Sequence, residues 1–242
     1  MRQLTLDLSA PVRPTLENFV IGANAEMHRA VNDFVSGNLK ETVLYLWGPS
    51  GAGKTHLLKS VIDAAEAAGR RTFYVGYGES GAIDSDLAGV DLLAADDVER
   101  LDLLGESEFF NIYNTLRDSG RRLIAAGKAP PASLKLRADV VTRLGWGLVY
   151  QVHPLTDAEK AQALADHARE RGFTLTPDIT DHLLNRVRRD MPTLLAVLDA
   201  IDRYSLEYRR PVTLTLVRQV LRESGAVPDN DTDNNAKNRE PK

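Results

Sequence analysis

The sequence contains no cysteine. Without thiols the chain can form neither disulfide bonds nor thiolate metal sites, and this fits a reducing compartment. It also lacks any run of about 18–20 apolar residues, the length that a membrane-spanning helix needs. The first residues, MRQLTLDLSAPVRP, hold too short an apolar run for a secretion signal. We therefore expect a soluble, cytoplasmic protein with no membrane partner.

An excess of positive charge is missing as well. The formal net charge is −4, so we expect no large basic surface for DNA and no direct sequence-specific DNA binding. The five histidines are scattered without the spacing of metal ligands. What the chain does have is 43% hydrophobic residues over 242 positions, enough for one large domain or two small ones.

Strands and helices alternate over the first part of the chain. The clearest strand is Val43–Trp47 (VLYLW), a continuous apolar run typical of a strand buried on both faces. We predict further strands at 72–77, 90–95, 123–126 and 148–152, and helices at 26–34, 55–68 and 107–119. This alternation predicts an α/β fold with a parallel sheet flanked by helices and joined by right-handed crossovers.

The pattern becomes all-helical after Pro154, where we place a hinge. We predict helices at 157–171, 178–188, 192–208 and 214–222. The residues after Pro228 are polar and are predicted to be disordered. The predicted organisation is an N-terminal segment at 1–14, a nucleotide-binding α/β domain at 15–154, a small helical lid domain at 155–225 and a tail at 226–242.

A glycine-rich loop follows the first strand and fits the pattern G-x-x-x-x-G-K-[ST]. In such a loop the glycines let backbone N–H groups face phosphate oxygens, and the following helix adds its positive end. The lysine reaches the β- and γ-phosphates and the threonine hydroxyl holds Mg²⁺. The candidate nucleotide-binding residues here are Gly48, Pro49, Ser50, Gly51, Ala52, Gly53, Lys54, Thr55 and His56. The pattern predicts ADP or ATP as the ligand.

Two aspartates come directly after the third predicted strand. Asp96 is the candidate acid on the Mg²⁺ side, together with Thr55, and Asp97 is the candidate water-orienting residue. The alternative is a strand-to-turn cap built from aspartates, which is common. The phosphate loop upstream favours the catalytic interpretation.

These motifs together resemble the AAA+ module of the bacterial replication initiator DnaA. The resemblance is carried by residues 47–58 (WGPSGAGKTHLL), Asp96-Asp97, residues 142–147 (TRLGWG) and the helical lid, and it spans residues 15–222. Residues 17–22 (ENFVIG) resemble the linker that contacts adenine in that family, which implies that Val20 and Ile21 contact the base. The residues that follow the lid in this sequence do not match the initiator's helix-turn-helix domain, so we expect that domain to be missing.

The N-terminus carries a second resemblance. The segment QLTLDL resembles the motif by which proteins dock onto the bacterial sliding clamp, the β subunit of DNA polymerase III. The residues concerned are Gln3, Leu4, Leu6, Asp7 and Leu8. Gln3 offers an amide for orienting hydrogen bonds, and the leucines offer apolar anchors for a pocket. On pattern alone a short edge strand with alternating leucines is favoured, and it is the position ahead of a DnaA-like module that favours the clamp motif.

The combination of a clamp motif with a DnaA-type module, and without a DNA-binding domain, resembles the Hda family of DnaA regulatory inactivators. The resemblance implies a clamp-bound, nucleoid-associated protein that stimulates ATP hydrolysis by DnaA in trans and prevents re-initiation. Arg143 matches the family's arginine finger, which acts on a neighbour's γ-phosphate. The alternative for Arg143 is a surface arginine at a helix end.

The chain departs from the family where the nucleotide sensors are expected. Ala126 and Gly127 cannot orient a water, and Lys128 has the opposite charge to the usual aspartate. Pro192 stands where the family places its second sensor arginine, and the sequence leaves open whether Arg188 or Arg189 replaces it. We therefore predict tight ADP or ATP binding with weak or no intrinsic ATPase activity.

Two other functions remain open on the sequence. One is a self-contained AAA+ ATPase of the helicase-loader type, which the intact phosphate loop favours. The other is a DNA-binding replication factor, which the acidic balance disfavours. The sequence decides neither the oligomeric state, so a homo-oligomer stays open, nor whether ADP or ATP is the active ligand, although the resemblance suggests ADP.

Overall fold

The structure, a computed structural model, describes residues 13–77 and 89–223. The described chain folds as two compact units, Arg13–Leu155 and 156–223. Each unit encloses a hydrophobic core of its own. No helix in the two described ranges is both long and apolar enough to cross a bilayer.

The first unit is built on a five-stranded sheet in the order β2-β3-β4-β1-β5. All neighbouring strands run parallel. The strands are β1 (Val43–Trp47), β2 (Thr72–Gly76), β3 (Leu92–Asp96), β4 (Arg122–Gly127) and β5 (Leu148–Gln151). Because parallel strands end at the same edge, the loops that follow β1, β3 and β4 meet there, where α/β proteins bind ligands.

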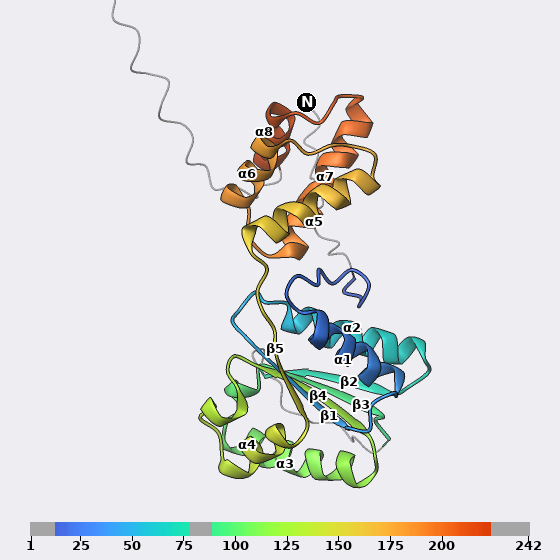
Figure 1. Ribbon diagram of the computed structural model, residues 1–242, viewed down its shortest axis with the longest axis vertical. Helices are drawn as coiled ribbons and strands as arrows, with labels where there is room; N and C mark the ends of the chain where they lie inside the picture. Colours follow the sequence, from blue (N-terminus) through green and yellow to red (C-terminus); the bar gives the residue numbers. More distant parts are fainter. Residues whose placement is uncertain (1–12, 78–88, 224–242) are drawn as a thin grey trace, which may run out of the picture. The chain divides into compact units, whose positions relative to one another are not determined.

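Helices cover both faces of this sheet. Helices α1 (Ala25–Ser36) and α2 (Lys54–Ala67) lie on one face, and α3 (Leu103–Asp118) and α4 (Ala138–Trp146) lie on the other (Figure 1). Alternate residues of β1 supply the two cores, since Leu44 and Leu46 pack with α1 and α2 while Tyr45 packs with α3 and α4. Burial on both faces explains the unbroken apolar run of this strand.

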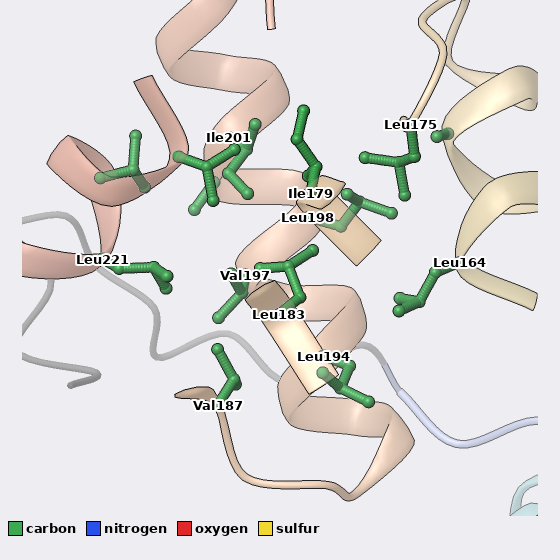
Figure 2. Close-up of a cluster of buried hydrophobic side chains, with 14 of the residues drawn as sticks. Leu164, Leu175, Ile179, Leu183, Val187, Leu194, Val197, Leu198, Ile201 and Leu221 are labelled. Carbon is green, nitrogen blue, oxygen red and sulfur yellow. The ribbon is translucent and has the colours of Figure 1, made fainter. Parts of the chain in front are cut away.

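The second unit consists of four helices around one core. They are α5 (Asp157–Glu170), α6 (Pro177–Arg186), α7 (Met191–Tyr208) and α8 (Leu214–Glu223). Figure 2 shows Leu164 of α5, Leu183 of α6 and Val197 of α7 among the side chains that fill this core. The Thr156 hydroxyl accepts from the Glu159 N–H, and the Glu159 side chain accepts in return from the Thr156 N–H, which fixes the start of α5.

The predicted fold class, a parallel α/β sheet of the P-loop type followed by an all-helical lid, is confirmed. Two helices differ from the prediction. Helix α3 begins at Leu103 rather than at residue 107, because the Asp102 carboxylate accepts from the Gly105 N–H at 2.8 Å and caps the helix there. Helix α4 was not predicted, since it is short, contains Gly145 and has no side-chain cap at its start.

Candidate nucleotide site

The loop between β1 and α2 requires glycine at three positions. A Cβ on Gly48 would lie 2.3 Å from the Val152 carbonyl oxygen. Gly51 and Gly53 have φ angles of +79° and +99°, in the left-handed region that glycine adopts without steric cost. Helix α2 has no acidic residue in its own first turn that would neutralise the positive end of its dipole. This loop and helix end together favour a bound polyanion such as a nucleotide phosphate chain.

Lys54, the first residue of α2, folds back over the loop. Its ammonium group donates hydrogen bonds to the carbonyl oxygens of Gly48 at 2.8 Å and Pro49 at 3.0 Å. The loop is also tied to β4, because the Gly48 N–H donates to the Gly127 carbonyl oxygen at 3.2 Å. A positive charge is thus fixed against the loop, where a phosphate chain requires it.

Asp96 ends β3 close to the start of α2 and is only 3% exposed. Its Oδ2 accepts from the Thr55 hydroxyl at 2.6 Å and the Tyr74 hydroxyl at 3.0 Å, and its Oδ1 accepts from the Asp97 N–H at 3.0 Å. Carboxylate and hydroxyl oxygens suit Mg²⁺, which takes its remaining ligands from phosphates and water. The donor set fits the predicted metal: Thr55 and Asp96 would hold the ion, which neutralises charge on bound phosphates.

Asp97 has a strained backbone. Its φ and ψ are 54° and 43°, and Arg209 is the other non-glycine residue with positive φ in the described ranges. Burial raises the pKa of the Asp97 carboxyl group, the charges of Asp96 and Glu99 raise it further, and Lys54 is among the opposing charges. Such strain costs roughly 1–3 kcal/mol and is concentrated at functional sites. Asp97 also stands at the N-cap position of the short 3-10 helix Val98–Arg100, and aspartate adopts this left-handed conformation more readily than most residues.

The linker before α1 packs directly on the phosphate loop. A Cβ on Gly53 would lie 2.8 Å from Cε2 of Phe19, so glycine at this position also admits the ring. Phe19 stacks on His28, with ring centroids 5.8 Å apart, and lies tilted against His56 at 5.7 Å. The linker and the loop thus form one packed unit.

Two imidazoles pin this linker by hydrogen bonds. Nε2 of His28 donates to the Leu16 carbonyl oxygen and Nε2 of His56 donates to the Thr15 carbonyl oxygen, both at 3.0 Å. A carbonyl oxygen only accepts, so both rings carry hydrogen on Nε2. Burial lowers the pKa of His56. We predicted His56 as a nucleotide-binding residue, and the structure places its ring against the linker.

The linker segment that carries Val20 and Ile21 is held by Asn24. The Asn24 amide is buried and donates from Nδ2 to the Ile21 carbonyl oxygen at 3.0 Å. The same amide also bonds to His153, just beyond β5. Ile21 itself is 40% exposed, as an apolar group that contacts a base requires. The structure therefore fixes the backbone of the predicted adenine-contacting segment.

Arg143 lies in the last turn of α4 and makes its contacts there and on α3. Its guanidinium carbon is 3.8 Å from the centroid of the Phe110 ring. Nε donates to Oδ1 of Asn114 at 3.3 Å, and an Nη donates to the Asp139 carbonyl oxygen at 3.1 Å. The rings of Trp146 and Tyr113 lie 5.5 Å and 5.8 Å from the same guanidinium carbon. The structure does not bring Arg143 into the group around the phosphate loop, which lies with α2 on the other face of the sheet.

The end of β4 carries no polar side chain, because Ala126 packs into the core beside α1 and α2 and Gly127 is closely covered on the other face. A Cβ on Gly127 would lie 2.3 Å from the Tyr45 hydroxyl oxygen. That hydroxyl donates to the Ala129 carbonyl oxygen at 2.8 Å, and burial raises the pKa of Tyr45. Lys128 is exposed and its backbone N–H donates to the Glu99 carboxylate at 3.2 Å.

The two lid arginines that the sequence left open as sensors are paired within the lid. Pro192 is the second residue of α7, a helix capped by Asp190. Arg188 pairs with Asp190 at 3.2 Å, and Arg189 pairs with Asp157 at 3.4 Å.

Three residues of the site were missed by the sequence analysis: Phe19, Asn24 and Tyr74. Tyr74 looks like an ordinary core residue in the sequence, and only the register between β2 and β3 brings its hydroxyl to Asp96. The predicted clamp-binding residues Gln3, Leu4, Leu6, Asp7 and Leu8 lie outside the described part of the chain.

Two family models match the sequence. The model of the bacterial DnaA ATPase domain matches residues 12–82 and 77–151. The model of the Hda lid domain matches residues 157–221. The two matches correspond to the α/β unit and the helical unit.

Several solved structures share this fold. Domain III of the replication initiation protein DnaA from Thermotoga maritima has a TM-score of 0.68 and 22% identity, over 86% of this chain and 95% of that chain. AMPPCP-bound DnaA from Aquifex aeolicus has a TM-score of 0.66 and 25% identity, over 81% and 67%. The RuvB branch migration motor from Thermotoga maritima has a TM-score of 0.60 and 14% identity, over 88% and 74%.

The DnaA ATPase model matches more than half of the chain, and the Hda lid model matches nearly all of its helical unit. The fold, the phosphate loop and the paired aspartates agree with both matches. The chain therefore belongs to the DnaA-related AAA+ family of replication proteins, as an Hda-like member.

Proposed function

We propose that this protein is a nucleotide-bound regulator that stimulates ATP hydrolysis by DnaA in trans and so prevents re-initiation of replication. The observation that carries the proposal is a contrast within one site. The phosphate loop, Lys54, Thr55 and Asp96 are in place, whereas the end of β4 has no side chain that can orient an attacking water. Such a site suits nucleotide retention better than turnover.

The proposed ligand is ADP or ATP with Mg²⁺. Support comes from the oxygen pair of Thr55 and Asp96, 2.6 Å apart, and from the loop glycines. An adenine nucleotide analogue, AMPPCP, is bound to the similar DnaA of Aquifex aeolicus. Val20 and Ile21 would contact the base, and the charge of Lys54 would meet the β- and γ-phosphates.

Arg143 is the proposed arginine finger. A planar guanidinium stabilises charge that develops on a transferring phosphoryl group, and a finger supplied in trans contributes about 10³–10⁵-fold to the rate. Its place on α4, away from this chain's own phosphate loop, is consistent with action on a neighbour's nucleotide. The residues Gln3–Leu8 are proposed to dock on the sliding clamp, which would bring this finger to DnaA on DNA.

The proposal is tested with ATP-bound DnaA, clamp loaded on DNA, and this protein with ADP and Mg²⁺. We expect ATP hydrolysis by DnaA to accelerate only when all three are present. A variant carrying Gln3→Ala and Leu4→Ala should lose both clamp pull-down and stimulation while it still binds ADP. Unchanged clamp binding by this variant would exclude the docking segment, and stimulation without any clamp would exclude the need for docking.

A self-contained AAA+ ATPase is the second candidate, and the strained backbone of Asp97 beside Lys54 favours it. The two candidates differ in what the purified protein does alone. A retained nucleotide with hydrolysis near the uncatalysed level supports the regulator. Multiple turnovers of ATP without any partner, abolished by Asp97→Asn, would support the ATPase instead.

A further inference from the structure

Tyr74 lies beside the proposed metal site although it comes from a different strand. In the register of β2 and β3, Gly76 pairs with Asp96 and Tyr74 pairs with Ala94. Tyr74 and Asp96 are therefore diagonal neighbours on one face of the sheet, a spacing that a long aromatic side chain can span. The Tyr74 hydroxyl donates to Oδ2 of Asp96 at 3.0 Å.

The hydrogen bonds to Asp96 leave its two oxygens unequal. A carboxylate has about four lone-pair sites, two on each oxygen. Oδ2 accepts from two donors, Thr55 at 2.6 Å and Tyr74 at 3.0 Å, whereas Oδ1 accepts from the Asp97 N–H at 3.0 Å. The two donors on Oδ2 and the one on Oδ1 thus hold the carboxylate from three directions and leave one acceptor site of Oδ1 unused.

The Thr55 hydroxyl can act at this site in two ways. It donates its proton to Asp96, and its oxygen lone pairs can bind a metal ion. Tyr74 donates its hydroxyl proton to Asp96, and its ring lies 5.5 Å from the ammonium group of Lys59. Removing the Tyr74 hydroxyl would free one lone pair on Oδ2 and loosen the carboxylate without removing a metal ligand.

We propose that Tyr74 is a positioning residue for magnesium: it holds the Asp96 carboxylate beside the Thr55 hydroxyl, so that these two residues are in place for the ion and its water shell. This inference rests on the proposed binding of a magnesium nucleotide. Groups that hold a metal-binding side chain in place typically contribute 10–100-fold to metal affinity. Tyr74 should therefore act on the Mg²⁺ requirement and not on metal-free nucleotide binding.

The test compares Tyr74→Phe with Tyr77→Phe in the full chain. Tyr77 carries a buried hydroxyl that has no hydrogen-bond partner in the described structure, so Tyr77→Phe removes the same atom without removing a bond. Binding of a fluorescent ADP analogue is measured in EDTA and across a titration of Mg²⁺. The binding of each variant in Mg²⁺ is compared with the binding of the same variant in EDTA, so a smaller fraction of folded protein affects both measurements equally.

We expect Tyr74→Phe to raise the midpoint of the Mg²⁺ titration by about tenfold. Binding in EDTA should stay within twofold of wild type, and Tyr77→Phe should follow the wild-type curve. An unchanged midpoint in Tyr74→Phe, or an equal shift in Tyr77→Phe, overturns the role of Tyr74 and leaves the proposed function intact. Wild-type protein that binds no nucleotide, or binds it without regard to Mg²⁺, overturns both.

Discussion

The side-chain amide of Asn24 closes two hydrogen bonds with the backbone of His153, accepting from its N–H at 2.7 Å and donating to its carbonyl oxygen at 2.9 Å. A third bond joins the same amide to Ile21 at 3.0 Å. One buried side chain thus connects the linker before α1 to the end of β5. The geometry of the adenine-side segment therefore depends on residues more than a hundred positions away.

Asn24→Asp should destabilise the α/β unit by about 1–3 kcal/mol, because a carboxylate cannot donate to the His153 carbonyl oxygen. The Ile21 carbonyl oxygen loses one of two donors and still accepts from the Asn24 backbone N–H at 2.9 Å. ADP affinity should fall further than pyrophosphate affinity, since the phosphate loop is untouched. Urea denaturation and competition binding measure the two effects. Asn111→Asp, on the exposed surface of α3, is the matched control and should change neither. Equal losses for ADP and pyrophosphate would contradict a base-side role.

Gly127→Ala should destabilise the protein by about 1–3 kcal/mol, because the added methyl group would overlap the Tyr45 hydroxyl. Gly145→Ala is the natural control, since a Cβ there meets nothing within 4 Å and the position is helical. It should stabilise by about 0.5–1 kcal/mol. Thermal and urea unfolding check both, and a neutral Gly127→Ala would show that the end of β4 can accept a side chain.

The stability of the protein should depend on pH through His56. Burial lowers the pKa of His56 in the folded state, so the unfolded chain binds a proton more readily. The contribution of neutral His56 to the free energy of unfolding is complete above the unfolded pKa of about 6.5 and is lost as pH falls below that value. His56→Gln keeps an amide donor for Thr15 but cannot titrate. The free energy of unfolding should therefore fall less steeply between pH 7.5 and 5.5 in the variant than in wild type, and parallel curves would contradict this.

Arg143→Ala should leave ADP binding and clamp binding unchanged and lower the stimulation of DnaA by roughly 10³-fold or more. Arg143→Lys keeps the charge but loses the planar fork, so it should recover little of the stimulation. Single-turnover hydrolysis of DnaA-bound ATP is the measurement. Full stimulation by Arg143→Ala would place the finger elsewhere. Thr142→Ala, which removes an exposed neighbour on the same helix, should behave as wild type.

The main outline of the fold could be predicted from local patterns. The run Val43–Trp47 is buried on both faces, so its sequence alone marks a central strand. Helix α4 escaped prediction because its nine residues include Gly145 and its start has no cap, and its stability comes from packing on α3 and β1. Patterns in the sequence report on one element at a time, and α4 depends on its neighbours.

The candidate site shows the same limit. The phosphate loop is contiguous, so its spacing identified it. The contacts of Tyr74 with Asp96 and of Asn24 with His153 join separate elements, and each exists only because the sheet sets their register. Tyrosine and asparagine at those positions carry no local signal of that role.

The contacts of the Arg143 side chain within this chain must be broken before its guanidinium can bind another group. The guanidinium stacks on Phe110 at 3.8 Å and donates to Asn114, so it is not a free cation that extends into solvent. An acceptor must compensate for the lost stacking, worth about 0.5–1 kcal/mol at an exposed site, and for the lost hydrogen bonds. A single carboxylate offers little beyond that, whereas the concentrated charge of a triphosphate end offers more. If Arg143 is the proposed arginine finger, its contacts with Phe110 and Asn114 would favour transfer to a nucleotide that carries its terminal phosphate over transfer to a single carboxylate.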